Sequence, residues 1–578
     1  MSISKGILTS LLVFLLFTSF LSSGAVAASV DRDELSDEII SYMKAEYLGE
    51  NLIHLARTEL QAETRNYLGM DPLPEDETVL KIATTNAVEE ESLYDYYVGI
   101  FSHLSNMPLM QMDSKSNLVG LSAERYEVSA DNTEWTFYIK DDLYWSDGRK
   151  VTPEDVEFSL TYLAENFPKT AGWIEEDLES TSVSDEDNSV TFVFKQPYNN
   201  INLEFATYNL VPKHIWENIA NPDPKQYTSK GPYVGCGPYF LEEVNLDSAT
   251  LIFKKNPHWK GTDPNFGKIE IQLYANDNVA SLALEKGEAD TYYKYASSYP
   301  YESVESLTET GDFNLYIKEG FGLTFLGMNL QETPLSDPSF KEAIAYAIDY
   351  EQIIESETLG YGKLANKGFV PPGMIYYKDT EQLDYDITKA REILEAAGYT
   401  DNNQNGIYEG ADGNDISLLL LIRSGYENSG KFIKGDLEAA GIGVEIKSVD
   451  QATWISRKDN LDYDLTISGA TPWGMLMHAS WGTGYLDSRR TGTGVLHVLD
   501  DPEFQGLCDN ILATTDSGEL EDYASDVQDY YAEELPIIAL YWKDYVIPYN
   551  KEFTGWHYSP IFGIYNLDTF LNIKRISS

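Results

Sequence analysis

Cysteine is scarce in this chain, with only Cys236 and Cys508 among 578 residues. This excludes a disulfide-rich secreted scaffold, which needs many cysteines in a short chain. A C-x-x-C pair is missing, as are the H-E-x-x-H, G-x-S-x-G and phosphate-binding-loop motifs. The sequence therefore has no signature of a thiol redox enzyme, a metalloprotease, a serine hydrolase or a P-loop nucleotidase, and we expect no enzymatic activity.

Basic residues are also few. The chain has 41 Lys and Arg against 94 Asp and Glu, which gives a formal net charge of −53. A surface this negative repels phosphate backbones and anionic membranes, so nucleic acid is an unsuitable partner. The hydrophobic content of 43% is typical of globular proteins, and 578 residues predict two or three domains rather than one core.

Long hydrophobic runs are missing after the first residues of the chain. The apolar run 7–21 follows Lys5, and an A-V-A cleavage signature ends at Ala27. The run is short for a membrane span, so residues 1–27 are predicted to be a secretory signal peptide, with an uncleaved anchor as the alternative. No cysteine closely follows the run, which argues against a bacterial-type lipid anchor. We expect a secreted, extracytoplasmic protein.

Strand and helix patterns alternate along the rest of the chain. Residues 28–75 are charged and favour helix, which predicts an N-terminal helical extension and linker. A first strand is predicted from Val79. A later strand is predicted from the period-two spacing of Trp135, Phe137 and Ile139. This alternation predicts an α/β fold.

Capping residues mark several helix boundaries. Thr152 and the proline after it predict a helix start, and Asp155 lies at the third position after the cap, close to a capping-box pattern. Asp337, also followed by proline, predicts a second start. Gly398 and Gly441 predict helix ends.

Several of these segments, in this order, resemble the solute-binding proteins of ABC importers for dipeptides, oligopeptides and nickel, known as solute-binding family 5. The similar stretches extend from about Val79 to about Asn566. They read WTFYIKDDLYWSDGRKVTPEDVEFSL, NLVPKHIWENI, GCGPYFLEEV with KKNPHWKG, ALEKGEADTYY, FKEAIAYAIDYEQII, YDITKAREILEAAGYTDNNQNGIYEG and YDLTISG. Each stretch alone is a weak signal, and their number, order and spacing make the resemblance specific.

The resemblance implies a two-lobed, periplasmic-binding-protein-like class II fold that closes on a ligand between its lobes. The first lobe is discontinuous and would comprise residues 76–106, 231–312 and 535–578. An extra subdomain would fill 107–230, and the second lobe would span 313–534. The family also implies an importer permease and ATPase as partners, and we expect a monomer.

The same assignment bears on the cysteines. Cys236 would lie in the first lobe and Cys508 in the second. A bridge between them would lock the hinge, so we predict two free thiols.

The stretch TPWGMLMHASWGTGYLDSRR, residues 471–490, follows a predicted second-lobe strand, and the resemblance implies that it faces the ligand. The aromatic residues would stack on the ligand, and the arginines would hold a carboxylate. Hydrophobic core and direct metal ligation through Met475, Met477 and His478 are the alternatives. The candidate ligand-binding residues in this stretch are Trp473, Met475, Met477, His478, Trp481, Tyr485, Arg489 and Arg490.

Two further features concern the ligand. By position in the family, the loop after the first strand adds Thr85, Asn86 and Val88 as candidates. Peptide-binding members commonly have a W-x-x-D-Y pattern after the second-lobe strand, with an Asp that pairs with a peptide amine. This chain has Trp473 followed by glycine and methionine instead, which puts that contact in doubt.

The stretch DNNQNGIYEGAD, residues 401–412, has oxygen-bearing side chains at the spacing of a calcium loop, with Gly406 at the sharp turn. An ordinary Asn/Gly turn is the alternative, and it is favoured because the last position is Asp and two early positions are neutral amides. No cofactor is required by the sequence. The candidate calcium ligands are Asp401, Asn403, Asn405, Glu409 and Asp412.

These observations predict an extracytoplasmic solute-binding protein of an ABC importer. Short peptides are the leading ligand class, and nickel or a metal bound to a small chelator is the alternative. A cell-surface glycan-binding protein is the second alternative, because the 41 tyrosines would suit stacking on sugars. A glycosidase, which needs two facing carboxylates, is its enzymatic form.

Overall fold

The computed structural model divides the chain into two compact units, residues 1–79 and 80–578. The predicted signal peptide and N-terminal helical extension lie outside the described residues. The structure describes residues 78–85, 102–113, 118–166, 177–196, 205–217, 233–245, 247–294, 297–470, 486–489, 496, 498–514, 516–559 and 563–576.

An eleven-stranded sheet organises the second unit, in the order β15-β14-β16-β12-β17-β11-β1-β10-β9-β8 with β13 beside β17. Strand β1 is parallel to β11, and β14 is parallel to β15 and β16. The strands are β1 (Val79–Thr84), β8 (Tyr239–Asn245), β9 (Thr250–Lys255), β10 (Lys268–Leu273), β11 (Thr291–Tyr293), β12 (Phe313–Met328), β13 (Gly362–Lys363), β14 (Ser417–Arg423), β15 (Gly443–Val449), β16 (Leu465–Ala470) and β17 (Ile537–Asn550).

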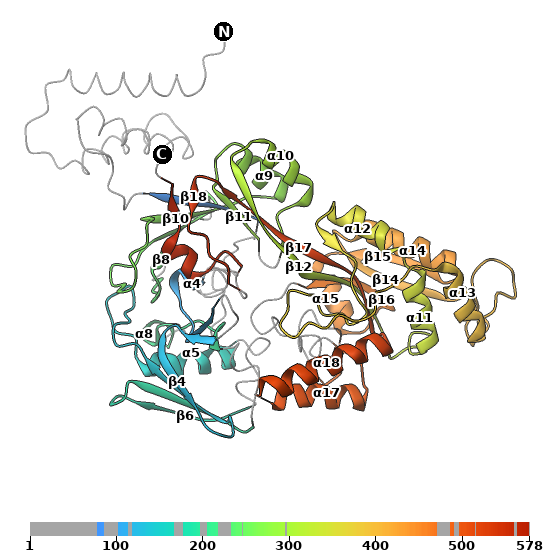
Figure 1. The fold of residues 1–578 in the computed structure, drawn as a ribbon, viewed down its shortest axis with the longest axis horizontal. Coiled ribbons are helices and arrows are strands. Elements are labelled where there is room, and N and C mark those ends of the chain that lie inside the picture. Colours follow the sequence, from blue (N-terminus) through green and yellow to red (C-terminus); the bar gives the residue numbers. More distant parts are fainter. Residues whose placement is uncertain are drawn as a thin grey trace, which may run out of the picture. The chain divides into compact units, whose positions relative to one another are not determined.

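The sheet contains two groups of parallel strands, one formed by β1 and β11 and the other by β14, β15 and β16. Two long antiparallel strands, β12 and β17, link these two parallel groups (Figure 1). They pair from Phe313 opposite Asn550 to Gly327 opposite Ile537. A shift of register interrupts the pairing between Lys318 and Gly322. Strand β16 pairs with the second half of β12, and β11 pairs with the last part of β17, so each parallel group adjoins a different half of the long pair.

The helices begin and end where the capping residues predict. The backbone amide of Asp155 donates to Thr152 Oγ1 at 3.3 Å, and the amide of Thr152 donates to Asp155 Oδ2 at 3.0 Å, which confirms the reciprocal cap of α5. Asp337 caps α11, and α14 ends at Gly441 with φ of +95°. The described helices include α4 (Ser102–Ser105), α5 (Pro153–Asn166), α8 (Lys213–Trp216), α9 (Asp277–Glu285), α10 (Val304–Glu309), α11 (Pro338–Ala347), α12 (Tyr350–Thr358), α13 (Ile387–Ala396), α14 (Glu427–Ala440), α15 (Gln451–Asp459), α17 (Pro502–Ala513), α18 (Ser517–Glu534) and α19 (Leu567–Asn572).

A separate four-stranded antiparallel sheet falls within the range 107–230 that the sequence assigns to an extra subdomain. Its order is β4-β5-β7-β6, and in β5 the side chains of Trp135, Phe137 and Ile139 are buried as the period-two pattern predicts. The lobe and subdomain boundaries themselves stay a prediction. The strands here are β4 (Ala123–Val128), β5 (Glu134–Ile139), β6 (Leu178–Ser184) and β7 (Ser189–Phe194), and the nearby hairpin comprises β2 (Met110–Met112) and β3 (Leu118–Gly120).

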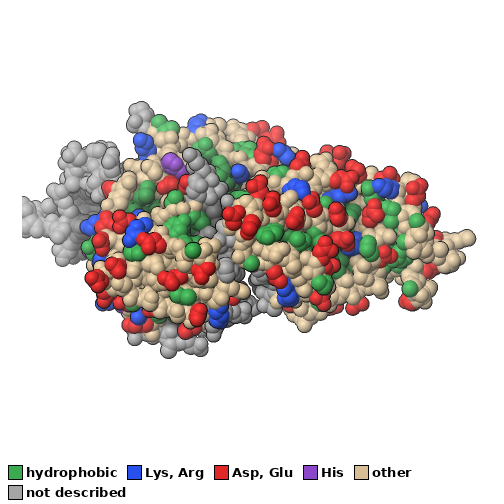
Figure 2. All heavy atoms as spheres, turned by 60° about the horizontal axis from the view of Figure 1, so that its bottom comes forward, with side chains coloured by type: hydrophobic (Ala, Val, Ile, Leu, Met, Phe, Trp, Pro, Cys, Tyr) green, Lys and Arg blue, Asp and Glu red, His purple; other side chains and the backbone are tan. Residues whose placement is uncertain are grey.

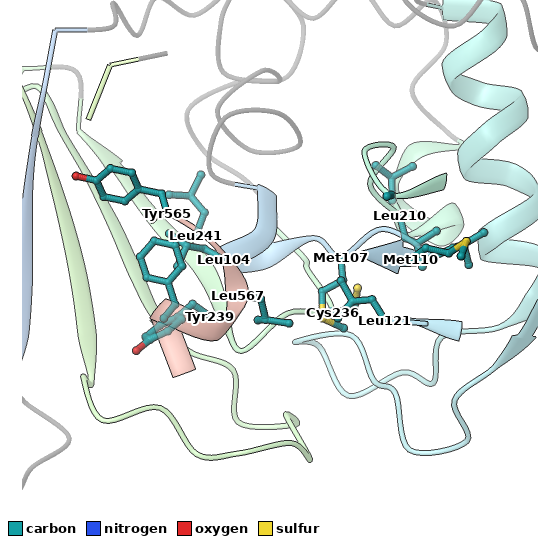
Figure 3. Close-up of a cluster of buried hydrophobic side chains, with 14 of the residues drawn as sticks. Leu104, Met107, Met110, Leu121, Leu210, Cys236, Tyr239, Leu241, Tyr565 and Leu567 are labelled. Carbon is teal, nitrogen blue, oxygen red and sulfur yellow. The ribbon is translucent and has the colours of Figure 1, made fainter. Parts of the chain in front are cut away.

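The two cysteines are free and buried, as predicted. Cys236 packs in one hydrophobic cluster, near Met107 and Leu121 (Figure 3). Cys508 belongs to a different cluster, which also contains Phe504. The two thiols are therefore parts of separate cores.

The surface reflects the acidic composition, since Asp and Glu side chains are spread over the face in Figure 2 and outnumber Lys and Arg there. None of the described helices has the length and apolarity that are needed to cross a bilayer.

Candidate functional site at the middle of the long strands

The carboxyl ends of the parallel strands converge on the middle of β17. Strand β16 is antiparallel to β12, and β12 is antiparallel to β17, so β14 and β16 run in the direction of β17. Strand β11 is antiparallel to β17, so β11 and β1 run the opposite way. In open α/β sheets, ligands bind at the carboxyl ends of parallel strands. Here the carboxyl ends of β14 and β16 approach a short stretch in the middle of β17 from one side, and those of β1 and β11 approach it from the other.

Lys543 lies on that stretch. Its neighbours across both adjoining strands are glycines, Gly322 in β12 and Gly362 in β13. A Cβ atom on Gly322 would lie 2.5 Å from Lys543 Cε, so the aliphatic part of the lysine occupies the space that a side chain on β12 would need. The sheet thus leaves room for the lysine by omitting a side chain opposite it.

The ammonium group of Lys543 is electrostatically unusual. Burial, which is the larger cause, and the positive charges of Arg423 and Lys294 together lower its pKa from 10.5 to about 8. Among the residues that the structure describes, no carboxylate forms an ion pair with it. Lys543 is therefore a partly buried cation whose charged form is disfavoured by burial and by two other cations.

Arg423 ends strand β14, where the apolar run SLLLLIR meets the carboxyl edge of the sheet. Its Nη1 donates to Gln451 Oε1 at 2.9 Å, and its Nη2 donates to Ser468 Oγ at 3.3 Å. Its Cζ lies 4.7 Å from the ring centroid of Trp454 and 5.4 Å from that of Tyr426. These contacts orient the guanidinium group, and none of these four partners carries a charge that would compensate it.

Lys294 directly follows β11 at the opposite edge. It forms a 2.7 Å ion pair with Asp277, which also accepts hydrogen bonds from Thr85 Oγ1 at 2.7 Å and from Tyr292 Oη at 2.9 Å. Burial opposes ionisation of Asp277, but these hydrogen bonds outweigh it and lower its pKa. Thr85, a predicted ligand residue, thus lies at the carboxyl end of β1 with its hydroxyl bonded to Asp277. Asn86 and Val88 lie outside the described residues.

Of the candidates in the stretch 471–490, the structure describes only Arg489. Its Nε and Nη2 contact both oxygens of Asp487 at 3.0 and 2.8 Å, and its Nη1 and Nη2 contact both oxygens of Asp509 at 3.1 and 2.8 Å. A guanidinium group held by two bidentate carboxylates has little capacity left for a ligand. This geometry favours a structural role for Arg489 over the predicted ligand contact. The candidates outside the described residues are Trp473, Met475, Met477, His478, Trp481, Tyr485 and Arg490.

The candidate calcium loop is a network of turns. Asp401 accepts backbone hydrogen bonds from Asn405 at 3.1 Å and Gly406 at 2.9 Å. Glu409 accepts hydrogen bonds at both oxygens from the amide of Asn402. Asn403, Asn405 and Asp412 each accept a hydrogen bond from the backbone amide two residues further along the chain. The last three bonds are typical of Asx turns, and they favour the Asn/Gly turn over a metal site. No group of three or more His, Cys, Asp or Glu residues able to hold a metal ion occurs among the described residues.

Lys543 and Arg423 are not among the ligand-binding residues predicted from the sequence. Lys543 and Asp544 are the charged residues of the largely apolar strand IIALYWKDYVIPYN, and Arg423 ends another apolar strand. A charged residue within a strand that is apolar on both faces can indicate a functional site. The reason is that burial of an unpaired charge is costly unless the charge has a compensating role.

Comparison with known proteins agrees with the architecture. A model of the bacterial extracellular solute-binding proteins, family 5, matches residues 117–491. A probable D,D-dipeptide-binding periplasmic protein of Escherichia coli is 24% identical over 465 residues, which cover 78% of this chain and 85% of that protein.

Solved structures share the fold. The oligopeptide-binding protein AppA from Bacillus subtilis, in complex with a nonapeptide, has a TM-score of 0.71 at 20% identity, with 86% of this chain and all of that chain covered. NikZ from Campylobacter jejuni, in complex with Ni(L-His), has a TM-score of 0.71 at 20% identity, with 87% of this chain and all of that chain covered. The fold is the two-lobed class II fold, and the chain belongs to family 5 of the bacterial extracellular solute-binding proteins.

Proposed function

We propose that this protein captures a small solute, most simply a short peptide, between two lobes and delivers it to the permease of an ABC importer. One observation carries the proposal: the carboxyl ends of two oppositely directed groups of parallel strands converge on the middle of β12 and β17. A ligand there would contact groups from both sides of the long strand pair, and such contacts favour closure.

The long strands would serve as the hinge. The register shift between Lys318 and Gly322 interrupts the regular hydrogen bonding of β12 at the point where the two parallel groups meet. A strand pair with a local irregularity bends there at lower cost than a regular ladder. The importer's ATPase and an extracytoplasmic location follow from the proposed role, and the predicted signal peptide supports that location.

Peptides come first because the E. coli relative is described as D,D-dipeptide-binding and the B. subtilis structure holds a nonapeptide. A metal bound to a small organic chelator is the second candidate. The C. jejuni structure holds Ni(L-His), and a carboxylate-bearing chelate would suit a site that contains Lys543 and Arg423.

A thermal-shift screen of the purified protein tests the proposal. The ligands are mixtures of di- to pentapeptides, nickel alone, nickel with histidine, nickel with citrate, and neutral oligosaccharides. A bound ligand raises the unfolding midpoint by mass action, and intrinsic fluorescence gives a second readout if Trp473 or Trp481 contacts the ligand. Stabilisation by peptides supports peptide capture, and stabilisation by a nickel chelate supports capture of a chelated metal. Stabilisation by oligosaccharides alone would overturn both.

A further inference from the structure

We infer that the stacked rings of Tyr301 and Tyr361, together with the backbone of Asp544 that binds both residues, form a brace across the proposed hinge. This brace favours the open arrangement of the two lobes. The inference rests on the proposed capture by lobe closure and adds a control element to it. The brace would change the affinity for every ligand by the same factor, because it acts on closure and contacts no ligand.

Both backbone groups of Asp544 bind these tyrosines. The amide of Asp544 donates to the carbonyl oxygen of Tyr361 at 2.9 Å, and the carbonyl oxygen of Asp544 accepts a hydrogen bond of 2.5 Å from the hydroxyl of Tyr301. The two rings stack on each other, with centroids 5.3 Å apart and an interplanar angle of 17°. One residue in the middle of β17 thus holds both tyrosines, and the tyrosines hold each other.

The two tyrosines come from opposite sides of the proposed hinge. Tyr301 begins the short 3-10 helix η5 (Tyr301–Ser303) directly before α10, within the range 231–312 that is predicted for the first lobe. Tyr361 lies between α12 and β13, within the range 313–534 that is predicted for the second lobe. A rotation of one lobe against the other would therefore act on this stack.

The brace lies on the face of the sheet opposite Lys543. Lys543 and Asp544 are consecutive in β17, so their side chains point to opposite faces. Val546 shares the face of Asp544. Tyr301 and Tyr361 pack against the hydrophobic cluster that contains Val546. Since Lys543 belongs to the candidate functional site, ligand and brace would lie on opposite sides of the long strands.

An ion pair adds to the contacts on the face of Asp544. Lys363 is directly opposite Trp542 in the pairing of β13 with β17, and such residues point to the same face of an antiparallel pair. The ammonium group of Lys363 pairs with Glu319, which lies in the irregular part of β12 on the other side of β17. The ion pair thus connects β13 to β12 across β17. Both side chains are more than half exposed, at 55% and 65%, so we expect it to contribute less than the stack.

Closure on the side of Lys543 would widen the opposite face. When two lobes rotate about a hinge so that one face narrows, groups attached on the other face move apart. The brace would therefore stabilise the open arrangement and reduce the fraction of ligand-free protein that is closed. The apparent dissociation constant is the intrinsic one divided by that fraction, so loss of the brace would tighten the binding of every ligand equally.

Two measurements on the purified protein test the inference: the radius of gyration of the ligand-free protein by small-angle X-ray scattering, and ligand affinity by isothermal titration calorimetry. Tyr301→Phe removes the hydroxyl that binds Asp544 and keeps the ring, while Tyr301→Leu and Tyr361→Leu each remove the stack. Tyr350→Phe is the matched control, because the hydroxyl of Tyr350 donates to the carbonyl oxygen of Ala345 at 2.7 Å, within the predicted second lobe. The probes are tri-alanine, penta-alanine and nickel–citrate.

We expect each leucine variant to have a smaller radius of gyration than the wild-type protein. We expect it to bind each probe that the wild-type protein binds about 3- to 10-fold more tightly, by the same factor for all probes. Tyr301→Phe should tighten binding about 2- to 5-fold, and Tyr350→Phe should change neither quantity. The double variant Tyr301→Leu/Tyr361→Leu should resemble Tyr301→Leu, because the two substitutions remove the same stack. A purely structural role would lower the unfolding midpoint without these changes.

An unchanged or larger radius of gyration in both leucine variants would overturn the inference, whatever the affinities are. Weaker binding in these variants, or a change of affinity that differs between probes, would also overturn it, since the latter indicates direct contact with the ligand. If no probe binds the wild-type protein, the peptide and chelate forms of the proposed function fail. The scattering comparison on ligand-free protein then still decides the inference by itself.

Discussion

The backbone amide of Gly320 donates a hydrogen bond of 2.8 Å to Oδ1 of Asp544, across the register shift between the two long strands. Gly320 has φ of +57°, and a Cβ atom there would lie 2.6 Å from Cγ of Pro372. Asp544 is buried, and this burial raises its pKa, while the hydrogen bond from Gly320 acts in the opposite direction. The bulge in β12 is thus held by a buried carboxylate on β17.

Gly320→Ala should therefore lower the unfolding midpoint. The left-handed backbone costs alanine about 1 kcal/mol, and the collision with Pro372 adds about 1–3 kcal/mol. Gly360→Ala is the control, because Gly360 also has positive φ, +93°, but its Cβ would meet nothing within 4 Å. Differential scanning calorimetry should show a clearly larger decrease for Gly320→Ala, and equal decreases would mean that Pro372 adjusts freely.

Binding of an anionic ligand should weaken as the pH rises from 7 to 9. Lys543 has a pKa of about 8 in the folded protein, so it is charged below this pH and neutral above it. Burial raises the pKa values of Tyr541 and Tyr545 on the same strand, so these phenols do not ionise in this window. Calorimetric titrations should show the pH dependence in the wild-type protein and a flat profile in Lys543→Met. A flat wild-type profile would contradict the role of this ammonium group.

The lowered pKa of Lys543 also makes the stability of the folded protein depend on pH. The folded pKa of about 8 lies below the ordinary value of 10.5, so the unfolded chain binds more protons between these pH values. The contribution of Lys543 to the free energy of unfolding should thus increase as the pH rises through this window. At pH 7, in the absence of ligand, Lys543→Met should raise the unfolding midpoint. Lys447→Met, which removes an exposed lysine of β15, should leave it nearly unchanged.

Arg489→Ala should lower stability and leave ligand affinity unchanged. Asp487 has no exposed side-chain surface, and Arg489 is its bidentate partner, with 43% of its own side chain exposed. Removal of this partner should cost about 1–3 kcal/mol, less than for a fully buried pair because solvent screens the arginine. Urea unfolding measures the stability change, and calorimetry measures the affinity. A loss of affinity with unchanged stability would restore Arg489 as a ligand residue.

The loop 401–412 should not bind calcium at millimolar concentrations. Its candidate ligands already accept hydrogen bonds from amides of the same loop, and a metal ion would have to displace them. Calorimetric titration of calcium into the protein should give no heat beyond dilution, with Asp401→Asn as the matched variant. Heat in the wild-type protein that disappears in Asp401→Asn would establish a calcium site there.

The two thiols should be unreactive in the folded protein. Burial raises the pKa of Cys236 to about 12, so the nucleophilic thiolate is rare at neutral pH, and Cys508 is also buried. Titration with Ellman's reagent should detect no thiol in the native protein and two after denaturation without reductant. Detection of none after denaturation would indicate a disulfide, contrary to the separate clusters that contain the two residues.

Much of the fold was predictable because its signals are local. The cap formed by Thr152 and Asp155 and the alternation of Trp135, Phe137 and Ile139 depend on residues a few positions apart. Backbone geometry dictates these periods, so they can be read without knowledge of distant partners. The order of the similar stretches carried the family assignment, which the comparisons confirm.

The candidate site was less predictable because it depends on pairing between distant segments. From the sequence, Arg489 could be a ligand-binding arginine, and only the fold shows that Asp509 lies beside it. Lys543 could likewise be an ordinary surface lysine, and only the strand pairing places it between β12 and β13. The sequence by itself therefore determined the family, the α/β alternation and the helix boundaries. Only the tertiary structure decided which cations are neutralised, because neutralisation depends on sheet register and on side chains from distant parts of the chain.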